Sequence, residues 1–395
     1  MCSLKRRLTK NLFISLFFIF LTSTITAQEK QNNFKFGGCV RFNIFAKSWV
    51  DKGTQPEFTW DVWRLNVDGT QGGIDFSFEY RFYPTFDTHF IHHGYLGYEF
   101  NENLYMKLGV MQVPFGITKF ASHSWWFQGQ YYVGLEDDYD IGIKFDYSGI
   151  DNLDLSFAYF RQAEPEGPSA SGVTYGNAGP GRYSYDITPG VGKVGTETVD
   201  AHIRELNQFN VRGAYHISDN VEVGLSGQVG GIYNSELDKA EISTALCAHL
   251  VGNWGKGWNF KGSYINYNYK AKADDGTKLD IIQMGAFGTP YDVAAKADIY
   301  SAGIAKSFDV DLGPIKSIQA YVDYSYIDKV KKEYADMHHL IPGVLISAGP
   351  VYTYIDYAIG KNQPWLTSSF GKGLGVGDED ADWNKRFNIN IGYYF

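Results

Sequence analysis

Basic side chains recur at the polar positions of alternating segments throughout this chain. Arg41, for example, stands between Val40 and Phe42, so one parity of that segment is apolar and the other is basic. A guanidinium fork matches the oxygens of phosphate or carboxylate, and a lysine ammonium attracts the same anions as a point charge. The candidates for an anion path are Arg41, Arg64, Arg81, Lys107, Lys144, Arg212, Lys261 and Arg386.

The same parity also carries acidic side chains, which permits a simpler interpretation. These residues are Asp75, Glu79, Asp140, Asp146, Glu222 and Asp323. Since the interiors of large barrels hold both signs of charge, structural ion pairing is the first interpretation for any one basic residue, and a role on an ion path is the alternative. After residue 27 the chain holds 31 basic and 44 acidic residues, a formal net charge of −13. Bulk charge therefore argues against a surface that simply attracts anions.

Alternation of this kind predicts strands with one apolar and one polar face. The final segment, Arg386 to Phe395, alternates at every position up to its terminal aromatic residue. A period of two puts an apolar stripe against either the core of a soluble sandwich or, in an outer-membrane barrel, the lipid. Similar segments recur from Phe34 onward, and most are 9 to 13 residues long. This length matches the roughly 9–11 tilted residues that cross a bilayer.

The connections between these segments alternate between short and long. Short connections are expected near 70–73, 101–103, 149–152, 218–220, 255–257, 310–315 and 348–350. Long connections are expected near 51–57, 84–93, 114–139, 163–205, 234–239, 270–297, 328–338 and 360–383. Seven short and eight long connections join sixteen strands, which predicts an all-β, up-and-down transmembrane barrel with both ends of the sheet on the short-turn side. The division at 348–350 rests partly on the need for an even number of strands.

The amino terminus resembles a secretory signal. Four basic residues precede an apolar run from Leu12 to Leu21, and this run is too short for a membrane-spanning helix of about 20 residues. We therefore expect residues 1–27 to be a signal peptide and residues 28–395 to form one barrel in the outer membrane of a Gram-negative cell. A mean hydropathy of −0.26 does not oppose this, because lipid-facing and lumen-facing residues cancel. Aromatic residues, at 17% of the chain, fit girdles at two membrane interfaces, and Cys39 and Cys247 are expected to be free thiols.

The third long connection, residues 114–139, is the candidate for a constriction. It contains the aromatic block Trp125–Phe127, the pair Tyr131–Tyr132 and the acidic run Glu136–Asp138. A loop so rich in large aromatic side chains is expected to fold into the barrel and not to extend into water. Lys119, close to the start of the loop, is the loop residue expected to reach the constriction.

Two short stretches resemble the phosphate-selective porins of the O and P type. Gly109 is followed by Pro114, Phe115 and Gly116, in the place where that family carries a Gly-x-x-x-x-Pro-Phe-Gly element before its constricting third loop. The last strand, ending in Phe395, also resembles that family. The resemblance implies a homotrimeric outer-membrane porin, surrounded by lipid and inserted by the barrel-assembly machinery, that passes phosphate or similar small anions.

Other functions have weaker support in the sequence. The acidic run 136–140 could hold Ca²⁺ but lacks the Gly-punctuated spacing of a dedicated loop, and the histidines at 89, 92 and 93 are expected to be solvated loop residues, so no metal is expected. Ser243 and His249 share the lumen parity, whereas a lipid hydrolase needs its nucleophile on the outer face, so we expect no enzyme. No cofactor and no nucleic-acid partner are expected. A general, weakly selective porin and a surface anchor or adhesin remain alternatives.

Overall fold

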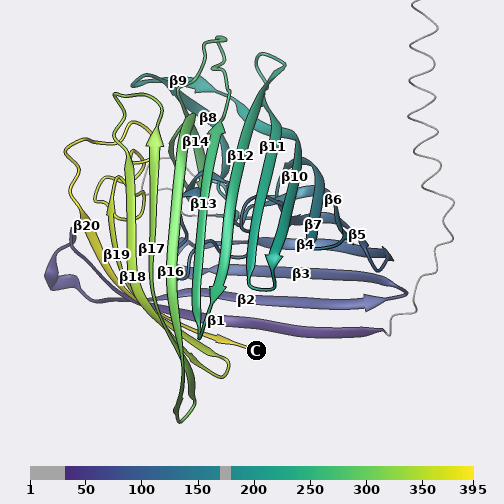
Figure 1. The fold of residues 1–395 in the computed structure, drawn as a ribbon. Helices are drawn as coiled ribbons and strands as arrows, with labels where there is room; N and C mark the ends of the chain where they lie inside the picture. The colour runs from purple at the N-terminus through teal and green to yellow at the C-terminus, as the bar shows by residue number, and fades with distance from the viewer. Residues whose placement is uncertain (1–31, 170–178) are drawn as a thin grey trace, which may run out of the picture.

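The computed structural model describes residues 32–169 and 179–395, and in this part of the chain sixteen strands form one closed barrel (Figure 1). Neighbouring strands are antiparallel, and the predicted residues 1–27 of the signal lie outside the described residues. The barrel strands are β1 (Asn33–Lys47), β2 (Glu57–Gln71), β3 (Ile74–Tyr83), β4 (Thr88–Asn101), β5 (Leu104–Gln112), β6 (Tyr139–Ile150), β7 (Leu153–Ala163), β10 (Ile203–Ser218), β11 (Val221–Asn234), β12 (Lys239–Trp254), β13 (Trp258–Asn268), β16 (Lys296–Leu312), β17 (Ile315–Lys329), β18 (Met337–Ala348), β19 (Val351–Lys361) and β20 (Asn384–Tyr394). The predicted fold class and strand number are confirmed.

The final strand closes the barrel. Ile389 of β20 pairs with Ile44 of β1 on one side and with Ile355 of β19 on the other. Beyond β20, the backbone N–H of Gly38 donates to the carbonyl of Phe395 at 2.9 Å, and the N–H of Phe395 donates back at 3.1 Å. The alternating carboxy-terminal segment therefore has a hydrogen-bonded partner along both edges, and closure leaves no sheet edge open.

All seven predicted short connections are turns, including the division between β18 and β19. One long connection is shorter than predicted, because β4 begins at Thr88 and so contains His89, His92 and His93. His338 and His339 likewise lie in β18. The expectation that the histidines at 89, 92 and 93 are solvated loop residues is wrong for His92, which is buried, and His339 is buried as well. In the described residues, no helix is long and apolar enough to cross a membrane.

Two long connections contain strands of their own. β8 (Asp186–Val194), β9 (Glu197–Ala201), β14 (Ile281–Ala286) and β15 (Thr289–Ala294) form a separate four-stranded sheet in the order β15-β14-β8-β9. The sequence predicted only loops over these ranges. The strands form because short apolar stretches, such as those around Ile282 and Met284, become fully buried against the barrel interior.

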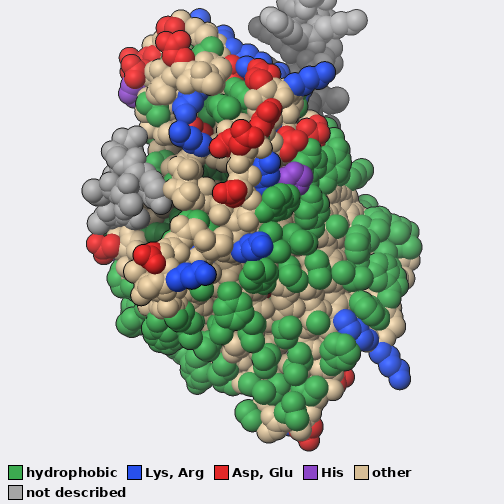
Figure 2. All heavy atoms as spheres, turned by 90° about the vertical axis from the view of Figure 1, so that its left-hand side faces the viewer, with side chains coloured by type: hydrophobic (Ala, Val, Ile, Leu, Met, Phe, Trp, Pro, Cys, Tyr) green, Lys and Arg blue, Asp and Glu red, His purple; other side chains and the backbone are tan. Residues whose placement is uncertain are grey.

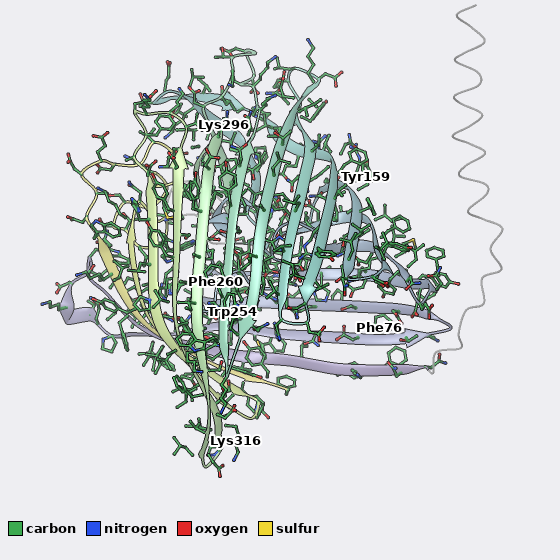
Figure 3. All side chains as sticks on the ribbon, viewed as in Figure 1. Phe76, Tyr159, Trp254, Phe260, Lys296 and Lys316 are labelled. Atoms are coloured by element: carbon green, nitrogen blue, oxygen red, sulfur yellow. The ribbon has the colours of Figure 1, made fainter. Side chains whose placement is uncertain are left out.

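The barrel wall has the two faces that its alternation predicts. On β12, Ile242 and Leu246 point outward and are 62% exposed, whereas Ser243 and His249 are buried inside. In Figure 2, hydrophobic side chains cover the lower part of the visible face, and most charged side chains gather toward the upper end. Figure 3 shows Trp254 and Phe260 near the turn end of β12 and β13, and their ring centroids are 6.0 Å apart. This pattern is that of a lipid-facing band with aromatic residues at its margin.

The outward face gives a testable prediction. Replacement of Leu246 by Arg places a charge on the apolar band. We expect this to destabilise the folded barrel, lowering its free energy of unfolding in lipid bilayers by about 2–4 kcal/mol. The measurement is reversible folding in vesicles followed by tryptophan fluorescence. Glu102→Arg, in the exposed turn between β4 and β5, is the control and is expected to change little. Equal effects of both variants would contradict the orientation of β12.

The internal sheet packs with the third long loop around buried tyrosines. Tyr291 donates its hydroxyl hydrogen to the carbonyl of Tyr132 at 2.6 Å, and Tyr131 donates to the carbonyl of Tyr183 at 3.3 Å. Tyr185 accepts from the indole N–H of Trp365, in the last loop, at 2.8 Å. Part of the barrel interior is therefore a packed core, which confines any open passage to the remaining part.

Candidate functional site

The third long loop, residues 113–138, folds into the barrel and is anchored where it begins. The backbone N–H of Val113 donates to the carbonyl of Asp138 at 2.9 Å, which closes the neck of the loop. Gly116 donates to Ser226 Oγ of β11 at 3.0 Å, and its carbonyl accepts from Arg212 Nε of β10 at 2.8 Å. The predicted Pro-Phe-Gly element thus fixes the loop to the wall formed by β10 and β11.

Both glycines of this element have backbone reasons to be glycine. Gly116 has φ +60°, a left-handed conformation that side chains disfavour. At Gly109, where φ is +136°, a Cβ atom would lie 2.3 Å from the carbonyl oxygen of Gly94 on β4. Gly109 therefore allows the close approach of β4 and β5, and Gly116 allows the turn into the loop.

The middle of the loop is anchored to β17 through Asp323, a fully buried carboxylate. Its Oδ2 atom accepts from the backbone N–H of His123 at 2.7 Å and from that of Ser124 at 2.8 Å, and its Oδ1 atom lies 2.8 Å from His123 Nδ1. Beyond it, Ser325 Oγ accepts from the N–H of Gly129 at 2.9 Å. These contacts draw the loop across to the side of the barrel formed by β10 to β17.

A cavity of about 520 Å³ remains between the loop and the wall formed by β1, β2, β3 and β20. Four arginines line this wall: Arg41, Arg64, Arg81 and Arg386. Arg41 pairs with Asp61 at 2.9 Å, while Arg81 and Arg64 lie 2.5 Å and 3.6 Å from Glu79. Lys47, at the rim, pairs with Glu57 at 3.1 Å. Five cations thus meet three carboxylates here, so the wall keeps an excess of two positive charges.

Arg386 differs from the other three arginines in its partners. Among the described residues no carboxylate lies within ion-pair distance of it, and its NH2 group donates to Asn388 Oδ1 at 2.9 Å. Its guanidinium carbon lies 4.0 Å from the ring centroid of Phe45 and 5.2 Å from that of Trp126. Arg386 therefore joins the basic wall to the aromatic side of the cavity.

Aromatic rings from several long loops form the opposite side of this cavity. The third loop contributes Trp125, Trp126 and Phe127, and Phe127 stacks on Tyr131 with ring centroids 3.7 Å apart. Further rings come from Phe86, Tyr183, Phe287, Trp365 and Phe370. Of these contributions, the sequence analysis identified only the aromatic residues of the third loop. The aromatic content of the segment 360–383 was a signal that could have revealed Trp365 and Phe370.

A second cavity, of about 480 Å³, lies on the turn side of the loop. Lys119 and Lys261 line it, together with residues of the turn between β12 and β13. Lys119 is exposed there and does not line the arginine cavity. The two cavities share Phe120, Ser122, Ser124 and Tyr354 in their walls, so they meet beside the middle of the loop.

The remaining basic candidates lie against protein groups. Lys261 donates to the carbonyls of Phe120 and Ser122 at 2.7 and 2.8 Å, and Arg212 pairs with Glu222 at 2.8 Å. Lys144 donates to the carbonyl of Gln112 at 3.2 Å, and Lys107 stacks over Tyr95 at 4.9 Å. The structure thus brings together Arg41, Arg64, Arg81 and Arg386, and it uses Lys261 and Arg212 to hold the third loop.

The acidic run of the third loop is turned away from both cavities. Glu136 is buried and accepts from the backbone N–H of Ala121 at 2.8 Å, and Asp137 accepts from the hydroxyl of Tyr183 at 2.6 Å. Burial raises the pKa of Glu136 to about 8, so this carboxyl is mostly neutral at pH 7. The acidic residues of the last loop, including Asp378 and Asp380, are exposed. The acidic run at 136–138 therefore adds little repulsion to an anion in the arginine cavity.

The raised pKa of Glu136 predicts a pH-dependent stability. The folded state favours the protonated form of Glu136. The free energy of unfolding is therefore not reduced by this residue below the unfolded pKa of 4.5, and it falls by up to about 5 kcal/mol as the pH rises toward 8. Glu136→Gln should remove this loss and be more stable than the parent at pH 9 but not at pH 4. Urea unfolding at both pH values measures it, with exposed Glu379→Gln as the control. A gain that is equal at both pH values would contradict a buried, neutral Glu136.

Comparison with known proteins gives a fold but no close relative. No protein-family model matches the chain, and no curated protein sequence matches it. Among solved structures, the outer membrane channel DcaP of Acinetobacter baumannii matches with a TM-score of 0.58 at 10% identity, over 93% of this chain and 99% of that one. The chain has a porin fold. The anion-selective porin from Comamonas acidovorans matches with a TM-score of 0.58 at 13% identity, over 92% of this chain and all of that one. Salmonella typhi OmpF matches with a TM-score of 0.58 at 10% identity, over 92% of this chain and 98% of that one.

The porin fold accounts for the general layout of the site and leaves the family open. Identities of 10–13% support a common architecture, in which loops and side chains set the selectivity. The resemblance to phosphate-selective porins of the O and P type is not confirmed by any of these matches. The roles of individual basic residues likewise stay predictions.

Proposed function

We propose that this protein is an outer-membrane porin that passes small anions by passive diffusion. The observation that carries this proposal is the group of four arginines, Arg41, Arg64, Arg81 and Arg386, facing the third loop across the 520 Å³ cavity. Their excess positive charge lies in a narrow space with low-dielectric walls, where charge acts on a passing ion more strongly than in bulk water. The fold shared with an anion-selective porin supports the same function.

The solute most favoured from the sequence is phosphate, and the aromatic side of the cavity supports a second candidate. Arg81 lies over the ring of Tyr183 at 4.5 Å, and Arg386 lies between Phe45 and Trp126. A carboxylate that carries an apolar or cyclic group can pair with an arginine and contact the rings at once, whereas phosphate uses only the arginines. Small organic anions are therefore the alternative solutes.

The test is the reversal potential of the purified protein in a planar bilayer under a chloride gradient. Anion selectivity is expected, and adding phosphate or benzoate to one side then identifies the anion that blocks the chloride current. Cation selectivity would overturn the anion proposal and leave a general, weakly selective porin. An absence of conductance would favour the alternative of a surface anchor or adhesin.

The assembly and setting follow from the same proposal. We infer a location in the outer membrane, with the apolar band in lipid, the long loops outside the cell and insertion by the barrel-assembly machinery. A homotrimer is implied by the resemblance, and an outer membrane protein of Vibrio cholerae with the same fold, at a TM-score of 0.54 and 13% identity, is described in a trimer form. Native mass spectrometry in detergent distinguishes a trimer from a monomer.

A further inference from the structure

Four buried carboxyl groups meet at the base of the third loop, outside both cavities. Asp138 ends the loop, Asp140 lies at the start of β6, Asp186 begins β8 of the internal sheet, and Glu164 follows β7. Their exposed fractions are 6%, 1%, 1% and 2%. Oxygen atoms of Asp138, Asp140 and Asp186 all lie within 4.8 Å of one another. Segments far apart in sequence therefore place acidic groups together in the interior.

The protein supplies few partners for this charge. One ion pair reaches the group among the described residues, from Arg182 NH1 to Asp186 Oδ2 at 3.2 Å, and Arg182 also pairs with Glu166. Gln208 donates to Asp140 Oδ2 at 3.1 Å, and the backbone N–H of Ser184 donates to Glu164 Oε1 at 2.9 Å. Four carboxyl groups against one shared guanidinium can be ionised together in this buried place only at a high cost, unless a cation binds them.

Three oxygens of the group receive no hydrogen bond at all from the described residues. They are Asp138 Oδ1, Asp140 Oδ1 and Glu164 Oε2, and each belongs to a side chain that is more than nine-tenths buried. Glu164, and also Glu205 of β10, lie close enough to Asp186 for their carboxyl groups to interact with it. Buried acceptors normally have donors, so three orphaned oxygens at one place indicate a missing electrophilic partner.

We propose that Asp138, Asp140 and Asp186, with Glu164 beside Asp186, bind one Ca²⁺ ion that fastens the base of the third loop to the internal sheet. These carboxyl groups supply hard oxygen atoms, and Ca²⁺ takes six to eight oxygens at 2.3–2.6 Å in flexible geometry. Ligands on opposite sides of such an ion are about 4.6–5.2 Å apart, so the oxygens of Asp138, Asp140 and Asp186, which lie within 4.8 Å of one another, fit around it. Zinc is disfavoured because the group contains no histidine or cysteine.

From the sequence, Ca²⁺ is a candidate only for the contiguous run 136–140, and no metal is expected. The sequence gives no sign that Asp186 and Glu164 lie beside that run, because both belong to the next long connection, 163–205. Within the run itself, Asp137 turns away to Tyr183 and Gln112, and only Asp138 and Asp140 face the group. The site therefore depends on the fold and not on a local loop motif.

Direct binding tests the proposal. The whole purified protein in detergent is stripped with EDTA and dialysed against radioactive CaCl₂, and about one ion per chain should bind at submillimolar concentration. Asp138→Asn combined with Asp140→Asn should weaken binding at least tenfold. Asp378→Asn combined with Asp380→Asn, the same change of charge in an exposed loop, should bind like the parent. No Ca²⁺ binding by the parent, or equal binding by the Asp138 and Asp140 variant, would overturn the proposal.

A second measurement on the parent protein covers the case in which that variant fails to fold. Tb³⁺ emission excited through tyrosine should rise on binding, because Tyr139 stands between Asp138 and Asp140, and Ca²⁺ should displace the signal more effectively than Mg²⁺. The midpoint of thermal unfolding should also rise by a few degrees when Ca²⁺ replaces EDTA. A Tb³⁺ signal that Ca²⁺ does not displace would overturn the proposal. Channel selectivity enters neither readout, so failure here is distinct from failure of the anion function.

Discussion

Exchange of Arg386 for Glu is expected to move the reversal potential under a chloride gradient toward cation selectivity, with an anion-to-cation permeability ratio lowered at least tenfold. The physical reason is the change of two charge units at the cavity wall, where the electrostatic interaction energy of one charge with a passing ion is about 1 kcal/mol or more. Arg386→Gln should give an intermediate ratio. Arg386 suits this test because no carboxylate among the described residues lies within ion-pair distance, so its removal leaves no orphaned acid.

Lys316→Glu provides the matched control for this prediction. Lys316 stands at the exposed turn between β16 and β17, where it pairs with Asp311 (Figure 3). The same charge reversal there should leave the permeability ratio within about twofold of the parent, because surface charges are screened by salt over about 10 Å. If both variants shifted the ratio alike, the selectivity would come from overall charge and not from the arginine wall.

The barrel could be predicted from the sequence because the information for it is local. Each strand carries its own alternation, as Ile242 and Leu246 show against Ser243 and His249, and each turn carries its own break in that pattern. Barrels of this kind have an even number of strands, and this requirement predicts the division at Gly349 and Pro350, where β18 ends and β19 begins. The inward folding of the third loop could also be predicted, since a loop of 26 residues with so many aromatic rings is expected to be buried.

The inner structure could not be predicted, because it depends on contacts between distant loops. Nothing near Ile282 indicates that β14 pairs with β8 across almost a hundred residues. The alternation placed eight basic residues inside the barrel. It could not distinguish Arg386, which lines the arginine cavity, from Lys261, which donates hydrogen bonds to two carbonyl groups of the third loop. Lys119 illustrates the same limit, because its distance from the arginines depends on how the loop crosses the barrel.

The acidic candidates show how burial changes the meaning of a charge. Asp323 was identified only as one inward acid among six, and its role becomes visible when the backbone N–H groups of His123 and Ser124 are seen to converge on it. A carboxylate that accepts two backbone N–H groups in a buried place fixes a loop much more firmly than an exposed ion pair does. Asp323, together with Ser325 and Lys261, therefore holds the middle of the third loop against this side of the barrel.

Removal of the Asp323 carboxylate should therefore release the third loop. In Asp323→Ala the N–H groups of His123 and Ser124 lose their acceptor, and we expect the folded protein to lose about 3–5 kcal/mol of stability. The loop should then sample positions away from β17, so single-channel records should show larger or strongly fluctuating conductance and weaker ion selectivity. Asp309→Ala, an exposed acid on the neighbouring strand β16, is the control and should leave both properties near those of the parent.

Two measurements separate this role from general damage to the barrel. Limited proteolysis should cut the Asp323→Ala protein within residues 117–128 while the barrel strands stay protected, because the loop is anchored independently at Gly116 through Ser226 and Arg212. Far-ultraviolet circular dichroism should stay close to that of the parent, since the sixteen-stranded wall makes its own hydrogen bonds. A variant with parental conductance and an uncut loop would show that Asp323 does not hold the constriction, and the anchoring would then have to come from Lys261 and Ser325, whose contacts lie on either side of it.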